Sequence, residues 1–345
     1  MPLFHSRHLV GSTSALLVWM VILTARPAAG EPPARPEPAA SQPLTRIGEQ
    51  ATGFVVTCFA VATQGDLVAI GSDDGNIRLW SLSANKVVRT IAATKKNFIG
   101  GVAFSPDGKK IVFHADNELV CLWDIESGMD LGRCPQEVAV IDHIGFSPSG
   151  GLVGVVSDSV GFVWDTNLGK TWKSEQPVSS LAFSPDGKSI ALGFNTVRLA
   201  EASSGRSIRE FGKVDGQVTS LAFYPDGAQL LAVDASCRGT MVRLLSVASG
   251  EETLIGDKIP SDGAGAAYAP DGKTIVVSDG MASLTFWDVS TAKSVRTIKG
   301  VDRSMSTLIF TPDGNRLLTG RNSEFGDILI WDTSSDMQPE KSLPE

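Results

Sequence analysis

The chain has 345 residues, of which 42% are hydrophobic and 20% are charged, with 35 Gly and 18 Pro. This composition is typical of a soluble globular protein and excludes a collagen-like, coiled-coil or wholly disordered chain. The formal net charge of −8 leaves no excess of Lys and Arg for a phosphate backbone, so we expect no nucleic-acid partner.

The first thirty residues have the pattern of a secretory signal peptide. Arg7 and His8 precede an apolar run over residues 9–23, and small residues follow it. A basic start, a short apolar centre and a small-residue end predict export to the periplasm or the cell exterior, with cleavage after Ala29 or Gly30. The alternative is an uncleaved N-terminal membrane anchor, because the apolar run is near the lower length limit for spanning a bilayer.

The next segment is a linker. Residues 31–43 hold five prolines, a density that favours an extended chain with nothing to pack. Loss of residues 1–30 would remove two Arg and no acid, taking the formal net charge from −8 to −10. We therefore expect a signal segment over 1–30, a linker over 31–43, one folded domain over 44–338 and a polar tail over 339–345.

A five-residue turn motif recurs along the rest of the chain. It combines an aromatic residue with Pro-Asp-Gly or a close variant, at intervals of 37 to 45 residues. Proline sets the first corner of a β-turn, Asp bonds its own backbone at the second, and Gly accepts the left-handed conformation that follows. Apolar stretches flank the turns, so the motif predicts β-hairpins. Its copies are Phe104–Gly108, Phe146–Gly150, Phe183–Gly187, Phe223–Gly227, Tyr268–Gly272 and Phe310–Gly314.

A second mark, Trp-Asp or Trp-Ser, lies about 18 residues beyond a turn. It follows strand-like runs such as 76–79 and precedes a further turn and strand, such as 86–91. Each period of about 42 residues therefore holds four short strands, the pattern of a propeller blade. The marks are Trp80-Ser81, Trp123-Asp124, Trp164-Asp165, Trp287-Asp288 and Trp331-Asp332.

Seven such units fit into the sequence, and the last one stops after its third strand. Residues Leu44–Ile47 are similar to the strand that ends other units, so we expect this N-terminal strand to complete the last blade. Closure of the ring would remove open sheet edges. The sequence predicts an all-β, seven-bladed β-propeller of four-stranded antiparallel blades. The units span about 54–91, 99–134, 140–174, 177–211, 217–256, 263–300 and 305–338.

The turn, the Trp-Asp pair and their spacing resemble the WD-repeat β-propeller family over residues 44–338. No repeat carries the Gly-His pair that the family often has before its first strand, so each buried Trp N–H needs another partner. Asp74 matches the tight-turn Asp of the family. Units four and five depart from the pattern with Ala200-Glu201 and Leu245-Ser246, and unit one lacks the proline turn.

The repeated aromatic residues and turn carboxylates are explained by the fold. Aromatic side chains at fixed repeat positions are expected to pack between blades. One Asp per blade cannot supply the about six to eight oxygen ligands of calcium. His114 and His143 are the two imidazoles beyond the signal segment, and we expect His114 in the core. A metal site with Asp116 and Asp142 is an alternative that no ligand spacing requires.

No catalytic motif is present, and we expect neither catalysis nor a cofactor. The sequence lacks a Gly-x-Ser-x-Gly elbow, a phosphate-binding Gly loop with Lys, and a His-Glu-x-x-His motif. Cys121 and Cys134 flank a turn almost symmetrically, so they are a candidate disulfide pair in an exported protein. The alternative is two small buried thiols.

The resemblance implies that loops at one mouth of the ring carry the function. Arg and aromatic side chains dominate interface hot spots. We therefore expect partner contacts from Phe98, Arg238, Arg303, Arg321 and Phe325.

The sequence thus predicts a non-catalytic, exported scaffold that binds a protein or peptide, with a membrane tether only if residues 1–30 are retained. The alternative is a metal-dependent, lactonase-like hydrolase with its site in the central channel. Mostly small, neutral residues begin the expected inner strands, with His143 as an exception, and they argue against the enzyme.

Overall fold

The structure is a computed structural model. It describes residues 45–47, 54–94, 98–115, 119–138, 140–236, 239–256, 265–279, 283–299, 305–321 and 328–333. The chain divides into two units, Met1–Pro38 and Ala39–Glu345, and every described residue belongs to the second. The expected signal segment, linker and polar tail lie outside the described residues. Within the described part, no helix is long and apolar enough to cross a membrane.

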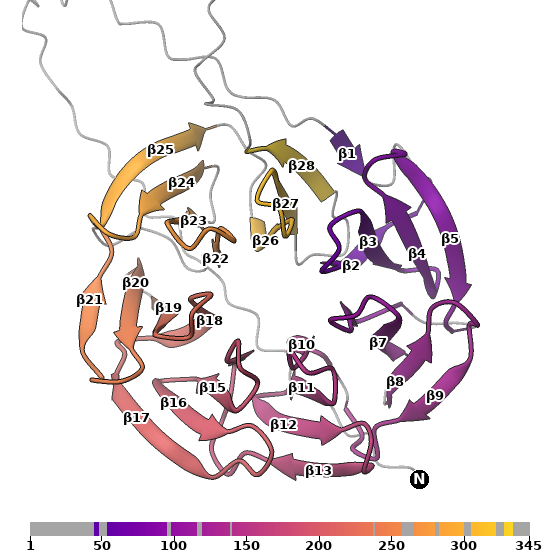
Figure 1. Cartoon of the computed structure of the whole chain (residues 1–345), viewed down its shortest axis with the longest axis horizontal. Coiled ribbons are helices and arrows are strands. Elements are labelled where there is room, and N and C mark those ends of the chain that lie inside the picture. The colour runs from indigo at the N-terminus through magenta and orange to yellow at the C-terminus, as the bar shows by residue number, and fades with distance from the viewer. Residues whose placement is uncertain are drawn as a thin grey trace, which may run out of the picture. The chain divides into compact units, whose positions relative to one another are not determined.

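Seven four-stranded antiparallel sheets surround a common axis (Figure 1). Six of them, blades 1 to 6, take their strands in chain order from the axis outward. Blade 1 holds β2 (Val56–Val61), β3 (Leu67–Ser72), β4 (Asn76–Ser81) and β5 (Lys86–Ala92). Blade 2 holds β6 (Gly101–Phe104), β7 (Lys110–Ala115), β8 (Leu119–Asp124) and β9 (Asp130–Arg133). Blade 3 holds β10 (His143–Phe146), β11 (Leu152–Ser157), β12 (Val160–Asp165) and β13 (Lys170–Lys173).

The second half of the ring repeats this order. Blade 4 holds β14 (Ser180–Phe183), β15 (Ser189–Gly193), β16 (Thr196–Glu201) and β17 (Ser207–Lys213). Blade 5 holds β18 (Gln217–Phe223), β19 (Gln229–Ser236), β20 (Gly239–Ser246) and β21 (Glu252–Leu254). Blade 6 holds β22 (Ala266–Tyr268), β23 (Thr274–Ser278), β24 (Ser283–Asp288) and β25 (Lys293–Lys299). Blade 7 holds β26 (Met305–Phe310), β27 (Arg316–Arg321), β28 (Ile328–Asp332) and β1 (Thr45–Ile47).

The strand that closes the ring comes from the other end of the chain. β1 pairs antiparallel with β28, Thr45 opposite Ile330 and Ile47 opposite Ile328. The predicted fold class, a seven-bladed propeller completed by an N-terminal strand, is confirmed. Blade 7 therefore has four strands, as its neighbours do. Its outer strand, β1, comes more than 250 residues before its inner strand, β26, in the sequence.

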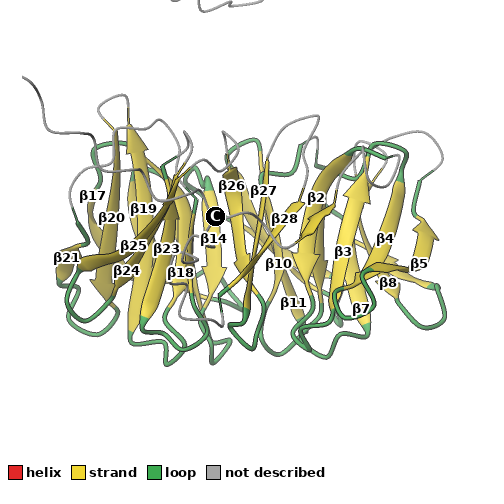
Figure 2. Ribbon diagram, turned by 90° about the horizontal axis from the view of Figure 1, so that it is seen from above, coloured by secondary structure: helices red, strands yellow, loops and turns green. Residues whose placement is uncertain are grey.

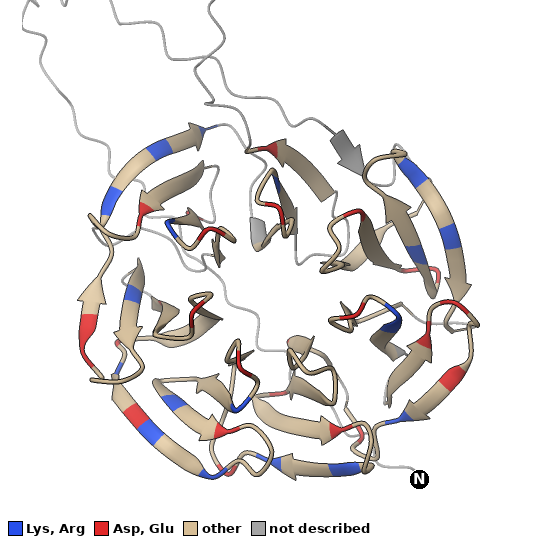
Figure 3. Cartoon of the chain, in the orientation of Figure 1, with Lys and Arg blue, Asp and Glu red and all other residues tan. Residues whose placement is uncertain are grey.

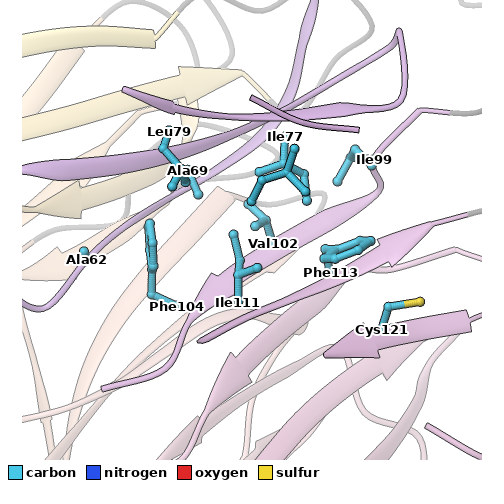
Figure 4. Packing of buried hydrophobic residues seen from close by; sticks show 11 residues of the cluster. Ala62, Ala69, Ile77, Leu79, Ile99, Val102, Phe104, Ile111, Phe113 and Cys121 are labelled. Carbon is cyan, nitrogen blue, oxygen red and sulfur yellow. The ribbon is translucent and has the colours of Figure 1, made fainter. Parts of the chain in front are cut away.

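Hydrophobic packing lies between blades rather than at one centre. Seven clusters of buried side chains occur, and each draws its members from two adjacent blades. Between blades 1 and 2, Ile77 of β4 packs with Val102 of β6 and with Phe113 of β7 (Figure 4). The cluster of blades 7 and 1 closes the circle. The repeated Trp residues pack toward the preceding blade, as Trp164 does in the cluster of blades 2 and 3.

The turns between first and second strands form a second closed belt. Gly150 has φ of +74°, which suits glycine, and it faces the Pro106 ring of the preceding blade. Blade 1, which lacks the proline, contacts blade 2 through the Gln64 side chain, whose amide donates to the Asp107 carbonyl at 3.4 Å. The Gly–Pro pairs of the belt are Gly65–Pro312, Gly150–Pro106, Gly187–Pro148, Gly227–Pro185 and Gly314–Pro270.

Outer strands reach the next blade with one long side chain at a shared register position. Arg89 of β5 donates to the carbonyl of Glu126 at 3.0 Å. Arg209 of β17 donates to the carbonyls of Ala248 and Ser249 at 2.8 and 3.1 Å. At the same position in blade 3, Trp172 Nε1 donates to the Ala202 carbonyl at 2.8 Å. These acceptors lie in the turn between the third and fourth strands of the following blade. Hydrogen bonds therefore connect these neighbouring blades at the outer circumference.

The outer strands also carry most of their charge as cations (Figure 3). An outer strand leaves one row of backbone groups unpaired, and charged side chains there discourage pairing with another chain. The described basic residues are Lys86, Arg89, Arg133, Lys170, Lys173, Arg209, Lys213, Lys293, Arg296 and Lys299, against the acids Asp130, Glu210 and Glu252.

The candidate disulfide between Cys121 and Cys134 is wrong. The register of β8 and β9 places Cys121 opposite Arg133, one residue away from Cys134. Because successive residues of a strand point to opposite faces, the two side chains lie in different clusters, Cys121 between blades 1 and 2 and Cys134 between blades 2 and 3. The structure holds both as thiols.

The buried Trp N–H groups are satisfied unequally. In blade 7, Trp331 Nε1 donates to Thr319 Oγ1 at 3.0 Å. The residues of blades 1, 3 and 6 that hold the register position of Thr319 are Ile70, Val155 and Val277. None of them has a hydroxyl, and the buried Nε1 atoms of Trp80, Trp164 and Trp287 lack a partner among the described residues. The expectation that each indole needs a new partner is thus met in blade 7 and not in these three.

This difference predicts a stability change of opposite sign in two blades. Thr319→Val removes the acceptor of a buried N–H, so we expect the free energy of unfolding to fall by about 1–3 kcal/mol. Val155→Thr, the converse change, offers Trp164 an acceptor and should raise it by about 0.5–1 kcal/mol. Chemical denaturation of the full chain measures both. A neutral Thr319→Val variant would contradict this account of blade 7.

Closure by β1 predicts a sharp boundary for N-terminal truncation. A chain lacking residues 1–43 keeps β1 and should unfold at the same temperature as the full chain. A chain lacking residues 1–50 loses the partner of β28, so we expect a loss of about 2 kcal/mol, at about 1 kcal/mol net per backbone hydrogen bond. It should also self-associate through the exposed edge of β28. Calorimetry and light scattering compare the two, and equal stability would show that β1 does not close the ring.

Candidate functional site

Loops and turns between the strands lie at two opposite ends of the ring (Figure 2). Because the strands of each blade are antiparallel, the turns between first and second and between third and fourth strands lie at one end, which we call the turn face. The turns between second and third strands and the segments that lead from one blade to the next lie at the other end, the connector face. Residues 98–100 and 174–179 are examples of such connecting segments.

The carboxylates of the turn face are occupied by their own turns. Asp107 accepts hydrogen bonds from Ser105 Oγ at 2.6 Å and from the Lys109 backbone N–H at 3.0 Å. The same pair of bonds occurs at Asp186 and Asp313. The hydroxyl and then the backbone N–H lower the pKa of each of these three carboxyls. These groups stabilise turns and are not available as ligands.

Asp74, which matches the tight-turn Asp of the resemblance, has the same kind of role on the connector face. Its carboxylate accepts from Ser72 Oγ at 2.6 Å and from the Asn76 backbone N–H at 3.1 Å, and it forms a salt bridge with Arg78. The Arg78 hydrogen bond is the largest cause of a strongly lowered Asp74 pKa. The Arg78 guanidinium also lies 4.0 Å from the centre of the Phe54 ring.

Hydroxyls at the start of the inner strands are used between blades. Thr57 Oγ1 donates to the Ile99 carbonyl of the next connecting segment at 2.6 Å. Ser179 Oγ, the equivalent group of blade 4, is 2.6 Å from the Val218 carbonyl and 3.0 Å from the Gly193 carbonyl. These contacts tie blade 1 to blade 2 and blade 4 to blade 5 near the axis, just as Arg89, Trp172 and Arg209 tie neighbouring blades at the circumference.

Of the five predicted contact residues, Phe98 is the one whose side chain the structure describes. Phe98 lies in the segment before β6 and is 51% exposed. Arg321 is the last residue of β27, opposite Met305, and its side chain is outside the described part. Arg238, Arg303 and Phe325 also lie outside the described residues. The five therefore remain a prediction, and Phe98 is the one whose exposure is known.

The two imidazoles occupy separate buried positions. His114 is buried on β7, and its Nε2 is 3.3 Å from the Val138 carbonyl, so the expectation of a core His is confirmed. Burial lowers its pKa. His143 begins β10 as a half-buried residue, and its Nδ1 is buried without a hydrogen-bond partner among the described residues. Burial lowers the pKa of His143 to about 4, so the ring is neutral near pH 7.

Three titratable side chains form a group in blade 5. Asp234 of β19 is buried and forms a salt bridge of 2.5 Å with Arg243 of β20, which also pairs with Glu252 of β21. The three charges satisfy one another across three strands, so the group is structural. Within the described residues, no three His, Cys, Asp or Glu side chains form a group that could hold a metal ion.

Comparison with known proteins shows which sequences this chain is similar to. Residues 56–149 match the sequence model described as "Anaphase-promoting complex subunit 4 WD40 domain". An uncharacterized WD repeat-containing protein of Synechocystis sp. is 30% identical over 148 residues, which is 41% of this chain and 41% of that protein. The chain is similar in sequence to WD-repeat proteins, and it has the fold of a seven-bladed β-propeller.

Other relatives extend the WD-repeat similarity along the ring. Actin-interacting protein 1 of Drosophila melanogaster is 25% identical over 287 residues, 79% of this chain and 46% of that protein. The guanine nucleotide-binding protein subunit beta of Oryza sativa subsp. japonica is 30% identical over 159 residues, 41% of this chain and 42% of that protein. The chain thus spans less than half the length of these relatives.

Sequence reasoning chose Phe98 by residue type and missed Val140, which is 54% exposed at the equivalent place before β10. Both residues directly precede the isoleucine that enters an inner strand, Ile99 and Ile141. Aligning the WD repeats on their inner strands, rather than searching for Arg and aromatic residues, is the signal that would have found Val140.

The neutral state of His143 predicts how stability depends on pH. An unfolded His binds its proton near pH 6.5, whereas folded His143 does so near pH 4. The contribution of neutral His143 to the free energy of unfolding is therefore complete above pH 6.5. It is lost as pH falls toward 4, by at most about 1.4 kcal/mol per pH unit. We expect the free energy of unfolding to decrease from pH 6.5 to pH 5, and His143→Gln to make that decrease smaller, with a remainder from buried His114, whose pKa is also lowered. An unchanged slope in His143→Gln, measured by urea denaturation, would contradict the assignment.

Proposed function

We propose that this chain is an exported, non-catalytic scaffold that binds a protein or an extended peptide through its connector face. One observation carries the proposal. The polar groups that repeat from blade to blade, such as Asp107, Asp186 and Ser179, are hydrogen-bonded within turns or between blades. What is left for a partner is the side chains that differ between repeats, and on the connector face these include exposed apolar groups. Function on a rigid scaffold usually lies in its loops.

The interblade hydrogen bonds favour tight docking. Binding by a flexible loop costs the entropy of ordering it, whereas a loop already held by its neighbours loses little. On the connector face, the backbone N–H of Ile99 donates to the Ser72 carbonyl at 3.1 Å, and that of Val178 donates to the Ser159 carbonyl at 2.8 Å. These two connecting segments are therefore fastened to the blades that precede them.

Names of the relatives are in line with protein binding. One is an actin-interacting protein and another is a subunit of a guanine nucleotide-binding protein. The similarity supports a scaffold of the same general kind, and the partner depends on loops that the repeats do not share. Export is proposed from the basic, apolar and small-residue pattern of residues 1–30.

Affinity capture tests the proposed face. With the full chain as bait in an extract of its own organism, we expect one partner to be recovered. Recovery should fall about tenfold in Phe98→Ser and in Arg303→Ala/Arg321→Ala, as for hot-spot residues. Leu168→Ser is the matched control, because Leu168 is 67% exposed on the turn face.

Loss of the partner in the control alone would place binding on the turn face and reject the proposal. A stoichiometric divalent ion in the purified protein would favour the channel hydrolase instead. N-terminal sequencing of the exported chain should begin at Gly30 or Glu31, and an intact residue 1 would reject cleavage.

A further inference from the structure

Several connecting segments direct one side chain outward at a shared place before the inner strand. Ile99, Val178 and Val218 are fully buried and enter blades 2, 4 and 5. Backbone N–H groups of all three are held by carbonyls of the preceding blade, those of Ser72, Ser159 and Phe194. Because neighbouring side chains in an extended segment point in opposite directions, the residue before each buried one faces solvent.

In three successive blades this outward residue is apolar. Phe98 precedes blade 2 and is 51% exposed, Val140 precedes blade 3 and is 54% exposed, and Pro177 precedes blade 4 and is exposed. The inner strands β6, β10 and β14 are neighbours in the ring, so the three residues follow one another along the connector face. The run stops on both sides: Val55 of blade 1 is buried, and Gln217 of blade 5 is polar.

Acidic side chains accompany Val140 and Pro177, whereas the sequence that leads to Phe98 contains Lys95 and Lys96. The described turns and connecting segments of the connector face between β9 and β18 contain no Lys or Arg. Arg198 of β16 reaches this end of the ring, where it donates to Ser174 Oγ at 3.0 Å and attracts Glu175. The other basic residues nearest the connecting segments end the outer strands, and they are Arg133, Lys173 and Lys213. Within these connecting segments themselves, the charged side chains are acidic. The exposed acids are Glu137, Asp142, Asp158, Glu175 and Asp215.

Two of these carboxylates lie close to each other. Asp142 accepts hydrogen bonds from the backbone N–H groups of Ser159 and Asp158. Partial burial and then the negative charge of Asp158 raise the Asp142 pKa. A cation from a ligand placed over this turn would relieve the repulsion between the two carboxylates. His143, the next residue along, is neutral near pH 7 and does not compensate them.

We propose that the apolar–acidic arc, formed by Phe98, Val140, Pro177 and the five acids, binds a segment of a partner protein in which Lys or Arg alternates with apolar side chains. The inference rests on the proposed function and narrows its partner to one chemical class. Apolar side chains of the partner would cover the arc residues, and its cations would face the carboxylates. Charge complementarity selects this occupant, because an acidic peptide or an anionic membrane would be repelled.

Selection from a phage-displayed library of random decapeptides tests the arc directly. With the full chain immobilised at low salt, we expect enrichment of peptides that combine Lys or Arg with Leu, Ile or Phe. The strongest peptide should bind about tenfold more weakly to Phe98→Ser/Val140→Ser and to Glu137→Gln/Glu175→Gln. Raising the salt should reduce the effect of the charge variant and leave that of the apolar variant, because salt screens exposed charges.

Matched controls come from the turn face. Leu168→Ser and Glu126→Gln/Glu251→Gln change exposed side chains of the same kinds and should leave binding within about twofold. No enrichment, enrichment of acidic peptides, or equal weakening by the control variants would each overturn the inference. So would self-association of the chain that the arc variants abolish, since the occupant would then be a second copy.

The outcomes separate this inference from the proposed function. A partner captured through Phe98 that contains no basic–apolar segment leaves the scaffold standing and rejects the arc chemistry. Capture through the turn face rejects the proposed face, whatever peptides the library yields.

Discussion

No blade of this protein can bury its own apolar surface. Each sheet is a single layer, and every hydrophobic cluster is built from the facing sides of two neighbours, including the cluster in which blade 7 meets blade 1. The ring is therefore stable only as a closed set, because an open array would leave one apolar face on each terminal blade in water. Hydrogen bonds follow the same rule. Thr57 near the axis and Arg89 at the circumference both donate to the next blade rather than to their own.

The repeats are alike where they contact one another and unlike where they do not. Gly150 must stay small and left-handed because the ring of Pro106 lies against it. On the outer strands, Trp172 can stand where other blades have Arg, such as Arg209, because both side chains reach a backbone carbonyl in the next blade. By contrast, the hydrogen bond from Trp331 to Thr319 in blade 7 has no equivalent in blade 3. Val155 lies at the position of Thr319 there, so the Trp164 indole is held by packing alone. The fold tolerates a missing hydrogen bond more readily than a missing contact between blades.

Much of this architecture could be predicted because the same sequence pattern occurs in several blades. Six turns and five Trp residues in phase fixed the number of blades, and the incomplete seventh unit pointed to residues 44–47 as its missing strand. Register could not be inferred with the same accuracy, and a displacement by one residue placed Cys121 and Cys134 on opposite faces of one sheet. The ion group of Asp234, Arg243 and Glu252 belongs to blade 5, and no repeated sequence pattern predicts it. The connector face is equally unrepeated, and residue type alone led to Phe98 without Val140.

The pairing of β1 with β28 also sets the order of events during folding. The first strand of the ring to be synthesised is the last that can find its place, because β28 is made only after nearly the whole domain. Contacts so distant in sequence are slow to form, since the chain between them must be ordered first. Any mechanical load that reaches the ring from its N-terminal side would act first on these three residue pairs and would peel them apart one after another. The same strand thus completes the domain and is its most accessible point of failure.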